Sequence, residues 1–519
     1  MLKVRTNKVA PGNIAVQVVY RHNHKTEIVK HIGTARSQKE KEQFISLGNQ
    51  YIAENKQMPP LLPQVFSDGK KDDFLISLKH LKVGETSHAF AYEILSHFYQ
   101  VNGFDKVNNT LLRDLAFMRL IEPSSKLRAV ELLKEYFHIT YPINSVYEGL
   151  RSIEQIKEET EKAAVTFAQK HLSFDFSLVF YDVTTLYFET FKEDEDTTDE
   201  KGHTIVGLRK NGFGKEKKPG QPLILIGLLV TREGYPVAVE IFEGNTFEGK
   251  TMIPSILRFQ EKYHIKTLTI VADAGMLSFA NMEELKKHNL TYIVGARMGN
   301  LTATLIQDLA VSLRSTEGIY VKRETPHGTL ICDYSKKRAS KDKSDREKQI
   351  RKAQRQIEEG DPVLKRIPFL KEKTKTIYKL NLDLIEKDKL LDGLKGYYAN
   401  VLGMDESLIV ARYKDLWHVE KAFRIVKSDL EARPIFHHKR ESIAAHIGIV
   451  FVSLCLTKSI ELQTGYSIKK VMDSIWSILD IELIDTLTNR RFIKRMVTEG
   501  NEIVQLFEKL SSVHKSVTS

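Results

Sequence analysis

The sequence has few cysteines and no long apolar stretch, and both shortages exclude classes of protein. Cys332 and Cys455 are the only cysteines in 519 residues, too few and too far apart for a disulfide framework or a cysteine-ligated zinc site. The longest apolar runs, Pro222–Val230 and Ile447–Leu456, reach about half of a membrane span. The N-terminus has no apolar signal-peptide core. We therefore expect a cytoplasmic protein without a membrane partner.

An excess of one charge is also missing from the chain as a whole. The 78 Lys and Arg exceed the 67 Asp and Glu by only 11. The hydrophobic content of 42% excludes a wholly disordered chain. Residues 336–355 differ, with ten basic and three acidic residues for a net charge of +7. This segment, which begins with Lys336, Lys337 and Arg338, is either a contact to DNA phosphates or a solvated lysine-rich helix.

Composition and periodicity divide the chain into six expected parts. The first contains two strands and a helix, and Pro59, Pro60 and Pro63 after it are typical of a linker. The parts are an N-terminal hairpin-plus-helix module (1–58), a helical region expected to bind DNA (75–172), a first core part (173–297), a basic insertion (298–400), a second core part (401–464) and C-terminal helices (465–519).

The helical region contains a pair of short helices around Glu122-Pro123-Ser124-Ser125. Proline ends the first helix, and serine is a favoured N-cap for the second. Two helices joined by a tight turn suggest a helix-turn-helix, with Lys126 and Arg128 in position to contact DNA. Simple bundle packing explains the same pattern.

The core part changes to short apolar segments rich in β-branched and aromatic residues, as expected for buried strands. The expected order is strand, strand, strand, helix, strand, helix, strand. These segments are Ser177–Phe188, Leu223–Val230, Val237–Phe242, Thr251–Tyr263, Thr267–Ala272, Ser278–His288 and Thr291–Ala296. Antiparallel strands followed by strand–helix alternation predict an α/β fold with a mixed sheet flanked by helices.

Two aspartates occupy notable places in these strands. Asp182 lies inside an apolar strand, where an unpaired carboxylate is costly to bury. Asp273 follows the strand Thr267–Ala272 directly and precedes Ala274-Gly275. Taken singly, each has a structural explanation, as a hydrogen-bonded strand-end residue or as a turn residue.

A third acid comes from an expected helix over Ser407–Glu431. The helix has one apolar stripe, formed by Leu416, Val419, Phe423, Val426 and Leu430. Tyr413, Glu420 and Lys427 recur at intervals of seven residues and are expected on one face beside that stripe. An amphipathic helix with flanking charges would look the same, but three acids in these places together are harder to attribute to chance.

The three acidic segments together resemble the DDE transposases of bacterial insertion sequences, in the branch whose third motif carries Tyr, Arg, Glu and Lys on one helix. The matching segments are Phe180 to Thr185, Val271 to Gly275, Tyr413 to Lys427, Gly244-Asn245-Thr246 with Glu248 and Thr251, and Arg433 to His437. The resemblance covers about residues 85 to 460. It implies a ribonuclease-H-like core interrupted by an inserted subdomain.

The resemblance also implies the chemistry of the site. Asp182, Asp273 and Glu420 would be the catalytic and metal-binding residues, holding two Mg²⁺ ions for which Mn²⁺ can substitute. Tyr413 and Lys427 would position DNA phosphates. The family's Arg is replaced by Leu416, and Arg424 is a candidate to supply a similar charge.

The expected function is therefore cleavage of double-stranded DNA at the element ends and joining to target DNA, by a homodimer associated with the nucleoid. Two other interpretations stay open. One is a ribonuclease-H-like nuclease or resolvase without strand transfer. The other is a non-catalytic DNA-binding repressor derived from a transposase, against which the presence of all three acids argues.

Overall fold

The computed structural model of the protein describes residues 2–10, 13–22, 25–55, 80–198, 202, 204–214, 218–276, 278–359, 367–374, 377–486 and 489–497. The predicted proline linker at 59–63 lies outside the described residues. The chain forms two compact units. The first contains Met1–Phe174, Val426–Ala432 and His437–Ser519, and the second contains Asp175–Ile425 and Arg433–Phe436.

The N-terminal module is a three-stranded antiparallel sheet with one helix against it. Strands β1 (Leu2–Ala10), β2 (Asn13–His22) and β3 (Lys25–Ala35) pair in that order, and α1 (Gln38–Asn55) packs on them. The two predicted strands and the helix are present, but β1 was not predicted. Polar residues outnumber apolar ones in β1, so its strand conformation depends on pairing with β2.

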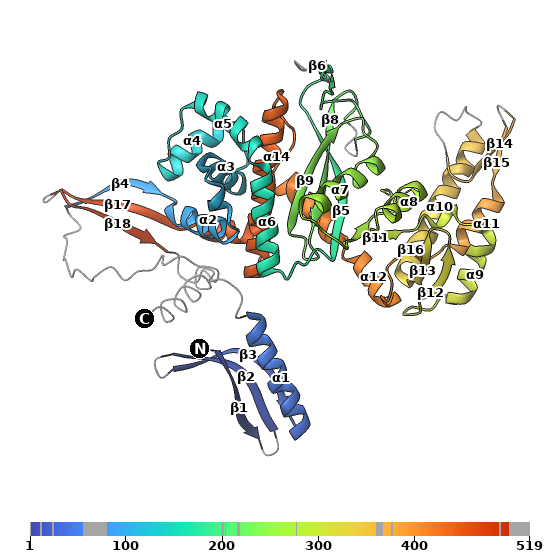
Figure 1. The fold of residues 1–519 in the computed structure, drawn as a ribbon, viewed down its shortest axis with the longest axis horizontal. Helices are drawn as coiled ribbons and strands as arrows, with labels where there is room; N and C mark the ends of the chain where they lie inside the picture. The colour runs from blue at the N-terminus through green and yellow to red at the C-terminus, as the bar shows by residue number, and fades with distance from the viewer. Residues whose placement is uncertain are drawn as a thin grey trace. The chain divides into compact units, whose positions relative to one another are not determined.

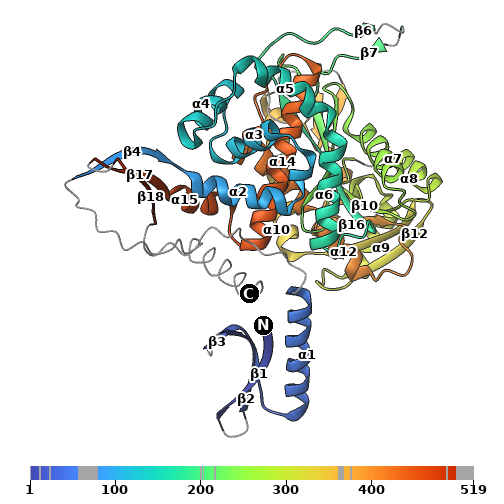
Figure 2. The same cartoon turned by 60° about the vertical axis from the view of Figure 1, so that its left-hand side comes forward.

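The rest of the first unit is mainly a helical bundle. Helices α2 (Ala89–Val101), α3 (Thr110–Ile121), α4 (Lys126–Phe137), α5 (Ile143–Gln155) and α6 (Lys157–His171) precede the core strands in the chain. Figure 2 shows α14 (Arg440–Thr464) lying among α2, α3, α5 and α6. The predicted stop and N-cap are confirmed, because α3 ends before Pro123 and the Ser125 side chain accepts a hydrogen bond from the Arg128 backbone amide at 3.2 Å.

Helix α14 is, among the described residues, the helix whose length and hydropathy would let it cross a membrane. In its most apolar 18-residue window, 89% of the residues are buried inside the protein. That burial is what the central helix of a packed bundle shows. Cys455 on this helix and Cys332 in the second unit are both buried.

As far as residue 497, the C-terminal part differs from the helices predicted over 465–519, of which residues 498–519 lie outside the described residues. Helix α15 (Ile468–Trp476) is followed by strands β17 (Leu479–Asp485) and β18 (Arg491–Met496). With β4 (Leu81–Ser87) they form a sheet of order β18-β17-β4. Leu479, Ile481 and Leu483 alternate with acidic residues, which is a strand pattern, and the pairing partner β4 lies almost 400 residues earlier in the chain.

The second unit is built on an eight-stranded mixed sheet of order β12-β13-β16-β11-β10-β5-β8-β9. In chain order, the elements of the predicted core are β5 (Leu178–Tyr187), β8 (Leu223–Val230), β9 (Pro236–Glu243), α7 (Met252–Lys262), β10 (Thr269–Ala272), α8 (Phe279–Lys287) and β11 (Thr291–Gly295). This confirms the predicted element order and the mixed α/β class. Strand β10 runs parallel to both β5 and β11, whereas β8 is antiparallel to β5 and β9.

Residues 298–400 add strands to this same sheet. They form α9 (Ala303–Leu313), β12 (Val321–Thr325), β13 (Gly328–Tyr334), α10 (Lys336–Glu359), β14 (Leu370–Thr374), β15 (Ile377–Leu380), α11 (Leu382–Leu390) and β16 (Leu394–Ala399). Strand β16 pairs with β11 on one side and with β13 on the other, so these strands continue the core sheet (Figure 1). The basic stretch is the first part of α10.

The predicted helix over Ser407–Glu431 is divided into three pieces. They are α12 (Glu406–Lys414), α13 (Trp417–Arg424) and a π-helical turn η5 (Ile425–Asp429). The break falls at Asp415, whose carboxylate lies 3.4 Å from the Arg412 guanidinium and 3.3 Å from that of Arg232. The apolar stripe is confirmed, since all five of its side chains are buried.

Candidate active site

The pairing of β5 and β10 brings two of the predicted acids to the same level. Tyr181 of β5 is the register partner of Ala272 of β10, and the strands are parallel. Asp182 of β5 and Asp273, directly after β10, are the next residues in the chain, so they follow the last register pair side by side. Asp182 is half-buried and Asp273 is exposed. The Asp182 Oδ1 atom accepts a hydrogen bond from the Val183 backbone amide at 2.8 Å.

Tyr181 packs on the opposite face of β5 and thereby fixes the orientation of Asp182, the next residue. The Tyr181 hydroxyl donates to Thr251 Oγ1 at 2.9 Å and lies 3.3 Å from Ser255 Oγ. A Cβ at Gly227 of β8 would collide with this hydroxyl, so the close approach requires glycine there. Because successive side chains of a strand point to opposite faces, Asp182 is directed away from α7.

Tyr413 of α12 connects the third motif to Asp273. Its hydroxyl donates to Asp273 Oδ1 at 2.9 Å, and the ring passes over Gly295 at the end of β11, where a Cβ would collide with the hydroxyl. Burial raises the pKa of Tyr413, and the negative charges of Asp273 and Glu420 raise it further. Tyr413 is therefore a neutral hydrogen-bond donor whose pKa responds to the charges of both acids.

Glu420 lies on α13, which packs against β5 and β8. Its side chain is exposed and stands in the first turn of the helix, where the backbone amides favour a negative charge. Throughout the described part of the chain, no group of three or more His, Cys, Asp or Glu side chains is close enough to hold an ion. The structure thus brings Asp182 and Asp273 together by register, and leaves Glu420 on a neighbouring helix at the surface.

The remaining predicted residues of the third motif are dispersed. Leu416 is buried, in keeping with its place in the apolar stripe, and Arg424 is exposed. Lys427 follows the break into η5 and belongs to the first unit. The interval of seven residues therefore does not keep Tyr413, Glu420 and Lys427 on one face of a single helix.

The basic stretch on α10 is largely a solvent-facing surface. Lys336, Lys337 and Arg338 are exposed, as are all other Lys and Arg of residues 336–355 except Arg346. Arg338 also lies 3.4 Å from Asp342, one turn further along the helix. The exposure of these side chains suits a contact with DNA phosphates.

The two predicted DNA contacts of the helix pair have different environments. Arg128 is on the surface, with its guanidinium 3.2 Å from Glu131 and 3.9 Å from Glu135. Lys126 is buried, and its Nζ lies 3.4 Å from Nδ1 of the buried His446. The Lys126 ammonium is therefore not on the outer surface of this folded unit.

Lys126 is part of a basic cluster in the first unit, formed with the buried Arg119 and His446 and the half-buried His437. His446 Nε2 lies 3.0 Å from the Ala432 carbonyl, and Arg119 donates to the carbonyls of Leu430 and Glu431 at 3.5 Å. Burial lowers the pKa of His437 to about 4, and the charges of Lys126, Arg119 and His438 contribute. The same burial and charges lower the pKa of His446. Both imidazoles are neutral in the folded unit at pH 7.

Acidification is expected to destabilise this unit. A histidine in the unfolded chain takes up a proton near pH 6.5, whereas folded His437 does so only near pH 4. The unfolded chain therefore binds more protons in this window, and the free energy of unfolding falls as the pH drops through it. For His437, a fall from about pH 7.5 to about pH 5 removes about 1–2 kcal/mol, allowing for its partial exposure.

The measurement uses the two tryptophans, Trp417 in the second unit and Trp476 in the first. A Trp417→Phe background leaves Trp476 fluorescence to report urea unfolding of the first unit. His437→Gln in that background should show a smaller loss of stability at low pH than the parent. An equal loss in both proteins would show that His437 is not the titrating group.

Sequence reasoning missed Lys395 and Tyr397, which flank Tyr413. Both are on β16, and the Lys395 ammonium lies 4.7 Å from the Tyr413 ring centroid and 5.6 Å from that of Tyr397. A lysine inside the apolar segment Leu394–Ala399 was the available signal. It was not recognised because the segment was assigned to an insertion, apart from the core sheet.

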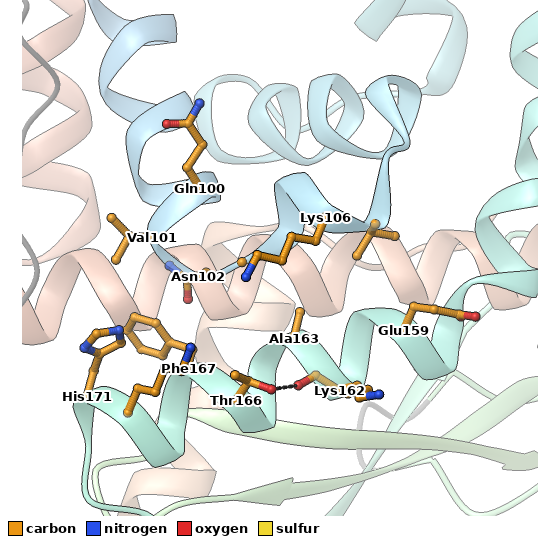
Figure 3. Close-up of a pocket in the computed structure, with 13 residues that line it drawn as sticks. Gln100, Val101, Asn102, Lys106, Glu159, Lys162, Ala163, Thr166, Phe167 and His171 are labelled. Atoms are coloured by element: carbon orange, nitrogen blue, oxygen red, sulfur yellow. Dashed lines mark hydrogen bonds between the residues drawn. The ribbon is translucent and has the colours of Figure 1, made fainter.

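The first unit has a cavity of its own, with a volume of about 340 Å³. Figure 3 shows Lys106 and Lys162 at this cavity, with Phe167 and His171 toward one end of α6. Of its lining residues only Glu159 is acidic. None of the three predicted catalytic acids lines it.

Comparisons with known proteins identify one family for this chain. A family model described as a transposase DDE domain matches residues 176–456, just over half of the 519 residues. No curated protein matches the chain. Two solved structures show a weak likeness. A piggyBac transposase synaptic complex with hairpin DNA has 11% identity and a TM-score of 0.34, over 75% of this chain and 70% of that one. A Mos1 mariner paired-end complex with Mn has 14% identity and a TM-score of 0.15, over 48% and 67%.

Proposed function

The chain belongs to the transposase DDE domain family, and on that premise we propose that it is a DNA transposase that cleaves the ends of its element and joins them to target DNA. The observation that carries the proposal is the parallel pairing of β5 and β10, which sets Asp182 and Asp273 side by side. Glu420 is the proposed third acid, on α13, which packs against β5. The matched residues 176–456 contain all three acids.

The proposal includes a ribonuclease-H-like core made of β9-β8-β5-β10-β11. The support is this strand order, in which β8 runs opposite to the other four strands. We assign the chain to the bacterial insertion-sequence branch because Tyr413, Glu420 and Lys427 keep that branch's spacing. Residue 416 is the departure, since a buried leucine stands where the branch has arginine.

Asp182, Asp273 and Glu420 are proposed to hold two divalent cations, Mg²⁺ or Mn²⁺. Their donor set is made of carboxylate oxygens only, which suits these ions. Bound in this place, such ions supply activation of a water or 3′-hydroxyl and stabilisation of the leaving oxygen. The chain itself orients two of the donors, through the Val183 amide on Asp182 and the Tyr413 hydroxyl on Asp273. Glu420 would have to approach the two aspartates to complete the site.

DNA contacts are proposed from two surfaces, one in each unit. The exposed basic side chains of α10 in the second unit and Arg128 on α4 in the first would bind backbone phosphates. A homodimer is proposed because two element ends have to be joined in one event. The cytoplasm, in association with the nucleoid, is the corresponding compartment.

The test is incubation of the purified protein with DNA containing its own element ends, a target plasmid and Mg²⁺. A transposase should release 3′-hydroxyl ends and then produce joined target strands. Cleavage without joined products would favour a nuclease or resolvase. Binding without cleavage would favour a repressor.

A further inference from the structure

A cavity of about 550 Å³ opens beside Asp273 within the second unit. Its wall includes Asp273, Gly295 and Tyr413 from the active-site side and Arg338, Arg346 and Lys395 from α10 and β16. The volume is enough for one nucleotide unit rather than for a single ion. Any group held in this cavity therefore lies next to a proposed catalytic acid.

Of the three basic residues in this cavity wall, Lys395 is the one whose positive charge is least compensated by nearby acids. Its half-buried ammonium packs on the rings of Tyr413 and Tyr397. Within the described ranges it has neither a hydrogen bond nor an ion pair. Asp333 is its register partner across β13 and β16, but that carboxylate accepts from the Tyr397 hydroxyl at 3.2 Å and lies 3.7 Å from Lys414 Nζ. The nearest cross-strand acid is thus engaged elsewhere.

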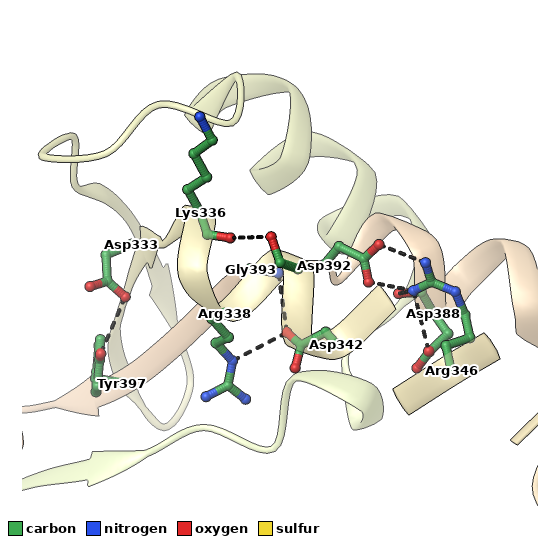
Figure 4. Close-up of polar contacts among 10 residues, drawn as sticks. Asp333, Lys336, Arg338, Asp342, Arg346, Asp388, Asp392, Gly393 and Tyr397 are labelled. Atoms are coloured by element: carbon green, nitrogen blue, oxygen red, sulfur yellow. Dashed lines mark hydrogen bonds and ion pairs between the residues drawn. The ribbon is translucent and has the colours of Figure 1, made fainter. Parts of the chain in front are cut away.

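The other two bases of the wall are bound to acids. Figure 4 shows the Arg346 guanidinium held by Asp388 and Asp392, and Arg338 reaching Asp342. The distance between Arg338 and Asp342 is 3.4 Å. Asp345, a further acid of the wall, lies 3.1 Å from Lys348. These pairs neutralise most of the charges in the wall and leave Lys395, Asp273 and Tyr413 as the polar residues at the active-site end of the cavity.

A partly buried ammonium on aromatic rings is costly unless an anion joins it. The burial of Lys395 and the nearby positive charge of Arg338 lower the pKa of the Lys395 ammonium, because both make its charged form less favourable. A lysine is a point charge suited to phosphate. The buried Leu416 cannot supply the positive charge that the family places at that position, and Lys395 supplies one beside Tyr413 instead.

We propose that Lys395 forms a phosphate-binding subsite beside Asp273, which holds a backbone phosphate of the DNA strand next to the bond that is cleaved. This rests on the proposed function, since it requires DNA at the active site. The tyrosine rings set the position of the ammonium, and the cavity receives the nucleotide attached to that phosphate.

The test compares Lys395→Met with Lys395→Arg and with Lys322→Met. Lys322 is a matched control, because it is an exposed lysine of the same sheet that pairs with Glu406 at 3.0 Å. Element-end DNA is titrated without Mg²⁺ at several salt concentrations. Lys395→Met should bind about tenfold more weakly and reduce the slope of log affinity against log salt by about one. Lys395→Arg should restore binding, and Lys322→Met should match the wild type.

The contacted phosphate is located with DNA in which single phosphates near the cleaved bond are replaced by neutral methylphosphonates. The wild type should lose affinity at one position at which Lys395→Met loses none. Equal profiles in the two proteins would overturn the subsite. Competition by inorganic phosphate or a nucleoside monophosphate as strong as that by the DNA strand would assign the subsite to a free ligand and overturn the DNA contact.

Failure of the proposed function gives a different result. If the wild type neither binds nor cleaves element ends, the transposase proposal fails. If the wild type does both and Lys395→Met behaves as the wild type does, only the subsite is wrong. Thermal melting of each variant separates loss of binding from loss of folding.

Discussion

Replacing Asp182 with asparagine is expected to abolish cleavage of element ends while leaving their binding nearly unchanged. Asparagine keeps the shape of the side chain and its acceptor for the Val183 amide, but removes the charge of a cation ligand. A bound cation supplies several kcal/mol of charge stabilisation in such reactions. A loss of about 4 kcal/mol slows cleavage about 1,000-fold.

The measurement is the single-turnover rate of cleavage in Mg²⁺, with DNA affinity measured in parallel. Asp308→Asn is the matched control, because Asp308 is a carboxylate of the same unit that pairs with Arg323 on the surface of α9. The control should cleave at the wild-type rate. Asp273→Asn and Glu420→Gln should resemble Asp182→Asn. A rate for Asp182→Asn within about tenfold of the wild type would remove this aspartate from the catalytic set.

The core strands and Asp182 were predictable because their signals are local. β-branched and aromatic runs mark β5 and β8, and a carboxylate inside such a run is rare enough to single out Asp182. The place of Asp273 beside it required the further step that β10 pairs with β5 in parallel, which the strand–helix alternation suggested.

What the sequence could not supply are the pairings between distant segments. Strand β16 joins β11 about 100 residues after it, so a range with an insertion-like composition became part of the core sheet. The helix breaks at Asp415, whose carboxylate pairs with Arg232, 183 residues away, and helical periodicity does not report such a contact. Strand β16 also carries Lys395, which lies beside the Tyr413 ring. This proximity is visible only once the sheet is assembled.

Replacing Arg346 with methionine is expected to destabilise the second unit by about 3 kcal/mol. The Arg346 side chain is only 5% exposed, and its guanidinium donates to Asp392 Oδ2 at 2.7 Å while also contacting Asp388 at 3.6 Å. Methionine fills much of the same volume, so the main effect is two carboxylates left near each other without a cation. The interaction also joins the basic helix α10 to the turn before β16, which carries Lys395.

Hydrogen exchange of α10 and β16, together with urea unfolding, measures this loss. The Arg346 charge holds down the pKa of Asp388, which burial raises. Without Arg346, the folded-state pKa of this carboxyl rises further above its unfolded value. Stability that depends on a protonated carboxyl is present at low pH and lost as the pH rises, so the cost of Arg346→Met should be smaller near pH 5 than near pH 7.5.

A second variant separates the charge effect from a packing defect. Arg346→Met combined with Asp392→Asn removes one of the stranded charges and keeps its shape, so it should recover part of the stability lost by Arg346→Met alone. A packing defect would show the same loss in both variants at every pH. A cost below about 1 kcal/mol for Arg346→Met would instead mean that the pair behaves as a solvent-screened surface contact. In that case α10 would be held in place by its apolar contacts, such as the buried Ala353, rather than by Arg346.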